Sequence, residues 1–65
     1  MSRQLLRRRE VLQRVALSSH QISRMIRAGR FPKPVRISDH AIAWDSAEID
    51  AWITDRITER DINVA

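Results

Sequence analysis

The chain has 65 residues, of which 43% are hydrophobic and 31% charged, with one glycine, two prolines and no cysteine. This length fits one domain over residues 1–65, with a core over about residues 5–57 and frayed ends, and the lack of cysteine excludes disulfides and thiolate metal sites. No apolar run approaches the roughly 18 residues of a membrane span, and the N-terminus lacks the apolar core of a signal peptide. We therefore expect a cytoplasmic protein.

The two halves of the chain carry opposite charge. Residues 1–38 hold ten basic residues against one acid, Glu10, which gives a net charge of +9. Residues 39–65 hold two arginines against seven acids, which gives −5. One end of the molecule is therefore expected to attract polyanions while the other repels them. The alternative is a small basic domain whose asymmetry has no functional meaning.

The first predicted element is a short helix over residues 9–16. Its apolar side chains fall at helical spacing, on Val11, Leu12 and Val15. No capping residue marks the place where this helix begins, so the pattern fixes the helix but not its first residue.

The second predicted element is a helix over about residues 19–28. Ser18 and Gln21 have the spacing of a capping box, in which each side chain bonds the backbone N–H of the other residue. Gly29 is the one glycine of the chain and stands where a left-handed residue would end the helix. Because only residues 16–18 separate the two helices, they form a helix-turn-helix candidate.

A β-hairpin and a third helix follow. Residues 35–37 and 41–44 alternate in the manner of short strands, and Asp45 with Glu48 repeats the capping pattern at a helix start. The apolar stripe of this third helix consists of Ile49, Trp52, Ile53 and Ile57. The order of helix, helix, hairpin and helix predicts a mainly α fold with a short β-hairpin, which is a winged helix-turn-helix.

The second helix is predicted to present a basic face. In projection, Ile22 and Ile26 point one way. The residues that point the other way, with two that flank them, are His20, Arg24, Arg27, Gln21 and Ser23. Arginine side chains form paired hydrogen bonds with guanine, and glutamine side chains do so with adenine. Residues 11–38 also include no acid that would repel the phosphates of DNA. We expect this helix to contact DNA bases; the alternative is a merely solvated basic helix.

Further DNA contacts are expected around that helix. We assign Ser18 to capping and Ser19 to a phosphate contact, and we leave Gln21 open between capping and a base contact. Contacts to the DNA backbone are expected from the arginine cluster near the N-terminus and from the hairpin, which would act as a wing: Arg7, Arg8, Arg9, Lys33, Arg36 and His40. Asp39 at the hairpin tip argues against deep contact by the wing.

Other kinds of chemistry are not expected. Trp44 and Trp52 lie in phase with apolar neighbours and are predicted to be core residues, and Phe31 is expected to fill the gap between the second helix and the hairpin. Two histidines without cysteines are too few ligands for a zinc site, so no metal is predicted. No cofactor and no small-molecule ligand are expected either. The chain is not expected to be an enzyme, because its clustered acids suit the first turn of a helix: Asp45, Glu48 and Asp50.

Several motifs resemble the AlpA family of phage and prophage regulators. They lie within about residues 5–53 and are Glu10-Val11, Leu17-Ser18, Ile22, the string Gly29-Arg30-Phe31-Pro32-Lys33-Pro34-Val35, Ala43-Trp44, and Glu48-Ile49-Asp50-Ala51-Trp52. The resemblance implies a winged helix-turn-helix akin to MerR-like and excisionase proteins, with a recognition helix over residues 19–27 and a wing over residues 36–40. Ser23, Ala16 and the Ser38-Asp39-His40 tip depart from the family pattern, which leaves the target sequence and the wing contacts open.

Two functions are therefore considered. The resemblance implies a sequence-specific DNA-binding regulator that controls a prophage integrase gene in the bacterial nucleoid, and the small size suggests several copies on repeated sites. The alternative is an excisionase, or recombination directionality factor, that acts as an architectural DNA binder and as an adaptor. In that case the acidic third helix and the tail, residues 58–65, would dock a basic partner such as an integrase.

Overall fold

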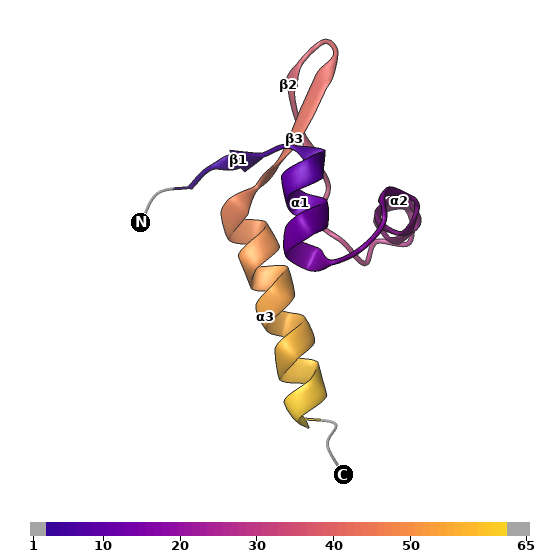
Figure 1. Ribbon diagram of the computed structural model, residues 1–65, viewed down its shortest axis with the longest axis vertical. Helices are drawn as coiled ribbons and strands as arrows, with labels where there is room; N and C mark the ends of the chain where they lie inside the picture. Colours follow the sequence, from indigo (N-terminus) through magenta and orange to yellow (C-terminus); the bar gives the residue numbers. More distant parts are fainter. Residues whose placement is uncertain (1–2, 63–65) are drawn as a thin grey trace.

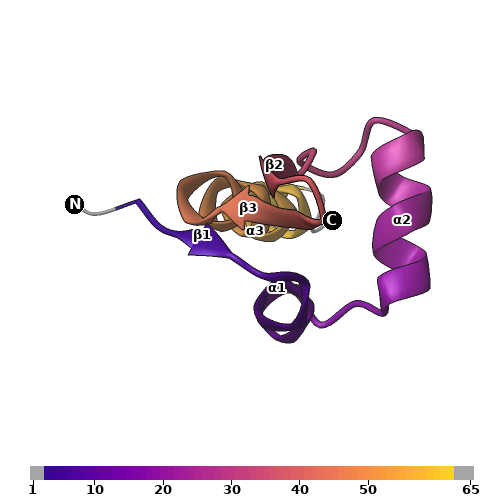
Figure 2. The ribbon, with the colours of Figure 1, turned by 90° about the horizontal axis from the view of Figure 1, so that it is seen from above.

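The computed structural model describes residues 3–62, which form a small winged helix-turn-helix (Figures 1 and 2). The elements in chain order are β1 (Leu5–Leu6), α1 (Arg8–Val15), α2 (Ser19–Arg27), β2 (Val35–Ser38), β3 (Ala41–Asp45) and α3 (Ser46–Ile62). The predicted order of helix, helix, hairpin and helix is confirmed, and β1 is an additional strand. No helix of the described chain is both long and apolar enough to cross a membrane.

The turns on both sides of α2 are fixed by local backbone geometry. Ala16 ends α1 in the left-handed conformation, with φ 59° and ψ 38°, and its N–H donates to the Leu12 carbonyl at 2.9 Å. The capping box that begins α2 is present as predicted. The Gln21 N–H donates to Ser18 Oγ at 3.1 Å, and the Ser18 N–H donates to Gln21 Oε1 at 2.9 Å. Gly29 follows α2 with a φ of 72°, as a left-handed cap requires.

The predicted hairpin is part of a three-stranded antiparallel sheet with the order β1-β3-β2. In the unpredicted strand, Leu5 lies opposite Asp45 and Leu6 lies opposite Trp44. Leu6 is buried, whereas Leu5 is 55% exposed. The sequence did not predict β1 because two adjacent leucines are too short a segment to show the alternation of a strand.

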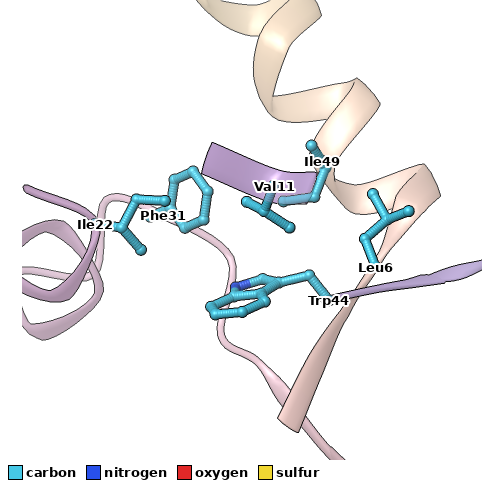
Figure 3. Close-up of a cluster of buried hydrophobic side chains, with 6 residues drawn as sticks. All are labelled: Leu6, Val11, Ile22, Phe31, Trp44 and Ile49. Atoms are coloured by element: carbon cyan, nitrogen blue, oxygen red, sulfur yellow. The ribbon is translucent and has the colours of Figure 1, made fainter. Parts of the chain in front are cut away.

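Every element except β2 contributes to one small core (Figure 3). Its buried side chains are Leu6, Val11, Ile22, Phe31, Trp44 and Ile49. Phe31 comes from the α2–β2 loop and packs edge-on against Trp52, with 5.0 Å between the ring centroids. The indole N–H of Trp44 donates to the Pro32 carbonyl and that of Trp52 donates to the Arg30 carbonyl, both at 2.9 Å. The core roles predicted for Trp44 and Phe31 are confirmed, while Trp52 is half-buried at the edge of the core.

The helix α3 begins at the core and continues past it. Asp45 caps its start, since the carboxylate accepts from the backbone N–H of Ala47 at 3.0 Å. The apolar stripe is buried at Ile49 but 47% exposed at Ile57, and Ile62 is 74% exposed. Figure 1 shows the C-terminal half of α3 extending away from the other elements. The helix is therefore longer than the core that it packs against.

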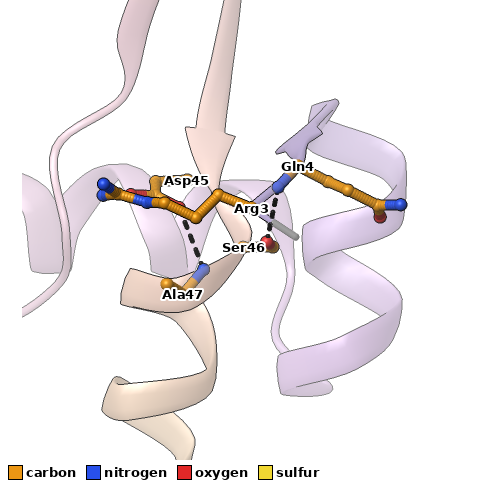
Figure 4. A network of polar contacts seen from close by, with 5 residues as sticks. All are labelled: Arg3, Gln4, Asp45, Ser46 and Ala47. Carbon is orange, nitrogen blue, oxygen red and sulfur yellow. Dashed lines mark hydrogen bonds and ion pairs between the residues drawn. The ribbon is translucent and has the colours of Figure 1, made fainter. Parts of the chain in front are cut away.

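Polar contacts fasten β1 to the junction of β3 and α3 (Figure 4). Arg3 forms an ion pair with Asp45, the Gln4 N–H donates to Ser46 Oγ at 2.9 Å, and the Ser46 N–H donates to the Gln4 carbonyl at 2.7 Å. The hydrogen bond from Arg3, followed by the one from the Ala47 N–H, lowers the pKa of the Asp45 carboxyl. The segment before α1 is thus held in place by both charge and backbone pairing.

Candidate nucleic-acid interface

The helix α2 lies along one side of the molecule, crosswise to α1 and α3 (Figure 2). Ile22 is completely buried beneath it, and Met25 and Ile26 are half-buried. The residues predicted to point outward are exposed: His20, Gln21, Arg24 and Arg27. Ser23 is half-buried at the edge of this face. The helical projection therefore placed the polar and apolar sides of α2 correctly.

Two polar side chains at the start of α2 are partly engaged within the protein. Gln21 uses its Oε1 atom in the capping box, which leaves the two N–H donors of its amide for a ligand. Ser19 Oγ accepts a hydrogen bond from Arg8 at 3.0 Å, and its hydroxyl can still donate one. The capping role of Gln21 is confirmed, and its base contact stays a prediction.

The arginine cluster at the start of α1 separates into two kinds of side chain. Arg7 and Arg9 are exposed. Arg8 is half-buried, and its guanidinium carbon lies 5.4 Å from the centroid of the Trp44 ring. Three adjacent arginines that look equivalent in the sequence therefore have different surroundings.

The hairpin β2–β3 projects from one end of the molecule, opposite to the projecting half of α3 (Figure 1). Lys33 precedes β2, Arg36 lies on β2, and His40 lies in the turn between the strands; all three are exposed. The backbone N–H of His40 donates to Ser38 Oγ at 3.4 Å, and the exposed Asp39 lies beside it. The predicted wing therefore carries basic side chains in the solvent, with one acid at its tip.

Intramolecular ion pairs engage only part of the basic half. Arg3 pairs with Asp45, and Arg14 lies 3.8 Å from both Glu10 and Asp50. Within residues 3–62, no ion pair involves the exposed basic residues of α2, of the α1 start or of the wing: Arg7, Arg9, Arg24, Arg27, Lys33 and Arg36. Their charges face solvent without a partner, which is the state that favours contact with phosphates.

Arg30 is a basic residue that the sequence prediction left out of the interface. It is exposed and lines a shallow hollow of about 300 Å³ beside α2, together with Gln21 and Arg24. The backbone N–H of Arg30 donates to the Met25 carbonyl at 2.8 Å. The signal that could have found it is Gly29, because a left-handed cap turns the chain back beside the last turn of the helix.

Comparison with known proteins assigns the family. The sequence model described as "Prophage CP4-57 regulatory protein (AlpA)" matches residues 4–57. The chain belongs to the AlpA family. A relative from Enterobacteria phage P4, "Uncharacterized protein ORF88", is 37% identical over 51 residues, which cover 78% of this chain and 58% of that relative. The chain thus spans little more than half the length of this relative.

Membership of the AlpA family confirms the resemblance drawn from the sequence motifs. The AlpA match includes all of α2 and of the wing, and it ends at residue 57, within the projecting half of α3. It extends a little beyond the predicted residues 5–53 at both ends.

The part of this AlpA-family chain that the structure describes has no group of three or more His, Cys, Asp or Glu side chains placed to hold a metal ion. His20 lies on α2 and His40 lies in the hairpin turn. Apart from Asp39 at the wing tip, the exposed side chains of the candidate interface are mainly hydrogen-bond donors and cations, which suit an extended anionic ligand.

Proposed function

We propose that this AlpA-family chain is a sequence-specific DNA-binding regulator, in which α2 enters the major groove of duplex DNA. The observation that carries the proposal is the exposed face of α2, whose arginines make no ion pair within residues 3–62. An α-helix fits the major groove, and a helix surface without acids avoids repulsion from the phosphates.

The proposed base contacts come from the outward face of α2. Arg24 and Arg27 suit bidentate contacts to guanine, and the free amide donors of Gln21 suit an acceptor on a base edge. His20 at the N-terminal end of the outward stripe, and Ser23 at its margin, supply adaptable donors and acceptors. These five side chains together read the sequence.

The proposed phosphate contacts surround α2. They come from the start of α1, the first residue of α2, the α2–β2 loop and the wing: Arg7, Arg9, Ser19, Arg30, Lys33, Arg36 and His40. Phosphate contacts fix the register of the helix in the groove without reading sequence. A single small module of this kind buries about 600–1,000 Å² of protein surface on DNA, so we propose that several copies bind repeated sites.

The regulated DNA that we propose lies upstream of a prophage integrase gene, in the bacterial nucleoid. The experiment that tests DNA reading selects bound duplexes from a random library with the full chain. A consensus sequence should emerge, and the double variant R24E/R27E should bind it at least about thirtyfold more weakly, since two base contacts are each worth about 1–3 kcal/mol. The matched control R60E reverses an exposed arginine on α3 and should keep its affinity.

A second candidate function is that of an excision directionality factor, which binds DNA and also docks an integrase. The projecting half of α3 favours it, together with a groove of about 650 Å³ between α3 and the α2–β2 loop. Phe31 and Trp52 line this groove, and so do the acids Glu48 and Asp55. A third acid of the lining, Glu59, is paired with Arg56 at 2.6 Å. A basic segment of a partner suits such a surface. The part of the proposed docking tail beyond Ile62 lies outside the described residues.

The two candidates respond differently to charge changes. An excision assay in which R24E/R27E is inactive while E48Q/D55N keeps full activity supports a regulator that acts through DNA alone. Loss of excision in E48Q/D55N, with operator binding unchanged, supports the adaptor.

A further inference from the structure

We infer that Arg8 is a positioning residue, which sets the orientation of α2 on DNA rather than making the phosphate contact proposed for Arg7 and Arg9. The inference rests on the DNA-binding function proposed above. It concerns how accurately α2 is presented to the bases, and not the charge that Arg8 adds to the basic half.

Arg8 makes two contacts that its neighbours do not make. Its guanidinium carbon lies 5.4 Å from the Trp44 ring centroid, and its Nη1 donates to Ser19 Oγ at 3.0 Å. A planar guanidinium can stack on an aromatic face and donate within its own plane at the same time. Trp44 is completely buried and its indole N–H is bonded to the Pro32 carbonyl, so the ring is a fixed platform. Arg8 therefore holds the first residue of α2 at a fixed place relative to β3.

The hydrophobic core holds α2 at a single fully buried residue. Within the helix only Ile22 is fully buried, and its other apolar side chains are half-buried. Polar contacts add an attachment at each end of the helix. At the start it is Arg8 to Ser19, and after the end it is the two indole bonds to the carbonyls of Arg30 and Pro32. Trp44 takes part in the attachments at both ends, so the tilt of α2 relative to the hairpin depends on this cluster.

Base contacts and phosphate contacts differ in how much misplacement they tolerate. A binding constellation works only when its side chains are held within about 0.5 Å and 10–20° of the productive geometry. Phosphates repeat along the duplex, and contacts to them support non-specific binding as well. Loosening one end of α2 should therefore weaken binding to the selected operator more than binding to random DNA.

The test compares the full-length wild type with R8Q, and uses R7Q as a matched control that removes the same charge from an exposed neighbour. Affinity for the selected operator and for a random duplex of equal length is measured over a range of salt concentrations. We expect R8Q to lower the ratio of the two affinities about tenfold, the size expected from misplacing one base contact. The slope of log affinity against log salt should stay at the wild-type value. R7Q should reduce that slope by about 0.9 and keep the ratio.

A second pair of variants tests the contact itself. If Arg8 acts through Ser19, the double variant R8Q/S19A should have the same ratio of operator to random-DNA affinity as R8Q alone. The reason is that either change removes the same hydrogen bond. Additive losses in the double variant would overturn this route.

Two other outcomes for R8Q would overturn the inference. A slope reduced by about 0.9 with an unchanged affinity ratio would make Arg8 a phosphate contact. Equal losses on both DNAs with an unchanged slope would mean that Arg8 only stabilises the fold. A wild type without any operator preference would defeat the proposed function itself, and that result is known before any variant is measured.

Discussion

Arg24 lies in the middle of the exposed face of α2, and truncation of its side chain tests a single proposed base contact. Because the side chain is exposed and makes no ion pair within residues 3–62, R24A should leave the fold intact. We expect the operator affinity to fall by about 1–3 kcal/mol and discrimination at one base pair to relax. Competition with operators that each carry one changed base pair measures this. An equal loss on every sequence would instead make Arg24 a phosphate contact.

Asp45 connects fold stability to pH. Arg3 and the Ala47 N–H lower its folded-state pKa, so the folded protein favours the carboxylate more than the unfolded chain does. The stabilisation is therefore complete above the unfolded pKa of about 3.9 and is lost as the pH falls through the lower folded value. In thermal unfolding, the Tm of the wild type should exceed that of D45N by a constant margin at pH above about 5. This difference in Tm should shrink below about pH 4. A margin that persists unchanged in strong acid would contradict the role of the ion pair.

At the scale of single elements, the two turns around α2 use different residues at positive φ. Ala16 has a φ of 59° and Gly29 has a φ of 72°. A left-handed conformation costs an L-residue about 1–2 kcal/mol, and glycine at position 16 would remove this cost. Glycine also makes the unfolded chain more flexible, which offsets about 0.4–1 kcal/mol of that gain. A16G should therefore stabilise the domain by up to about 1 kcal/mol.

The opposite change at the other turn is the matched comparison. G29A should destabilise the domain by about 1 kcal/mol, although nothing lies within 4 Å of a Cβ placed there, because the backbone conformation and not a collision is at fault. Urea unfolding of both variants measures the difference. If the free energy of unfolding changed in the same direction in both variants, this description of the turns would be contradicted.

How far the sequence predicts each element depends on how local its signals are. The start and end of α2 were predictable, since Ser18, Gln21 and Gly29 act through neighbouring backbone groups. The strand β1 was not, because it exists through pairing with a strand about forty residues away in the chain. The outward face of α2 followed from helical spacing. Nothing in the sequence separates Arg8 from the arginines beside it, since its partner Trp44 is brought near only by the fold.

At the scale of the whole molecule, the charge separation has a measurable consequence for binding. Arg3 and Arg14 are engaged in internal ion pairs, so not every basic residue is free to displace counterions from DNA. Five of the proposed phosphate contacts come from arginine or lysine, so the slope of log affinity against log salt should be about −4.5. Fluorescence anisotropy with labelled operator at several salt concentrations gives this slope. A slope as shallow as about −2 would mean that most of the proposed phosphate contacts are absent.

The central claim is that the outward face of α2 lies against duplex DNA, and amide chemical-shift mapping by NMR tests it most directly. The selected operator is added to the labelled full-length chain, and each backbone signal is followed. We predict the largest shifts at His20, Arg24 and Arg27, smaller ones over residues 33–40, and unchanged signals over residues 55–62. Shifts centred on α3 with unchanged signals from α2 would contradict the account.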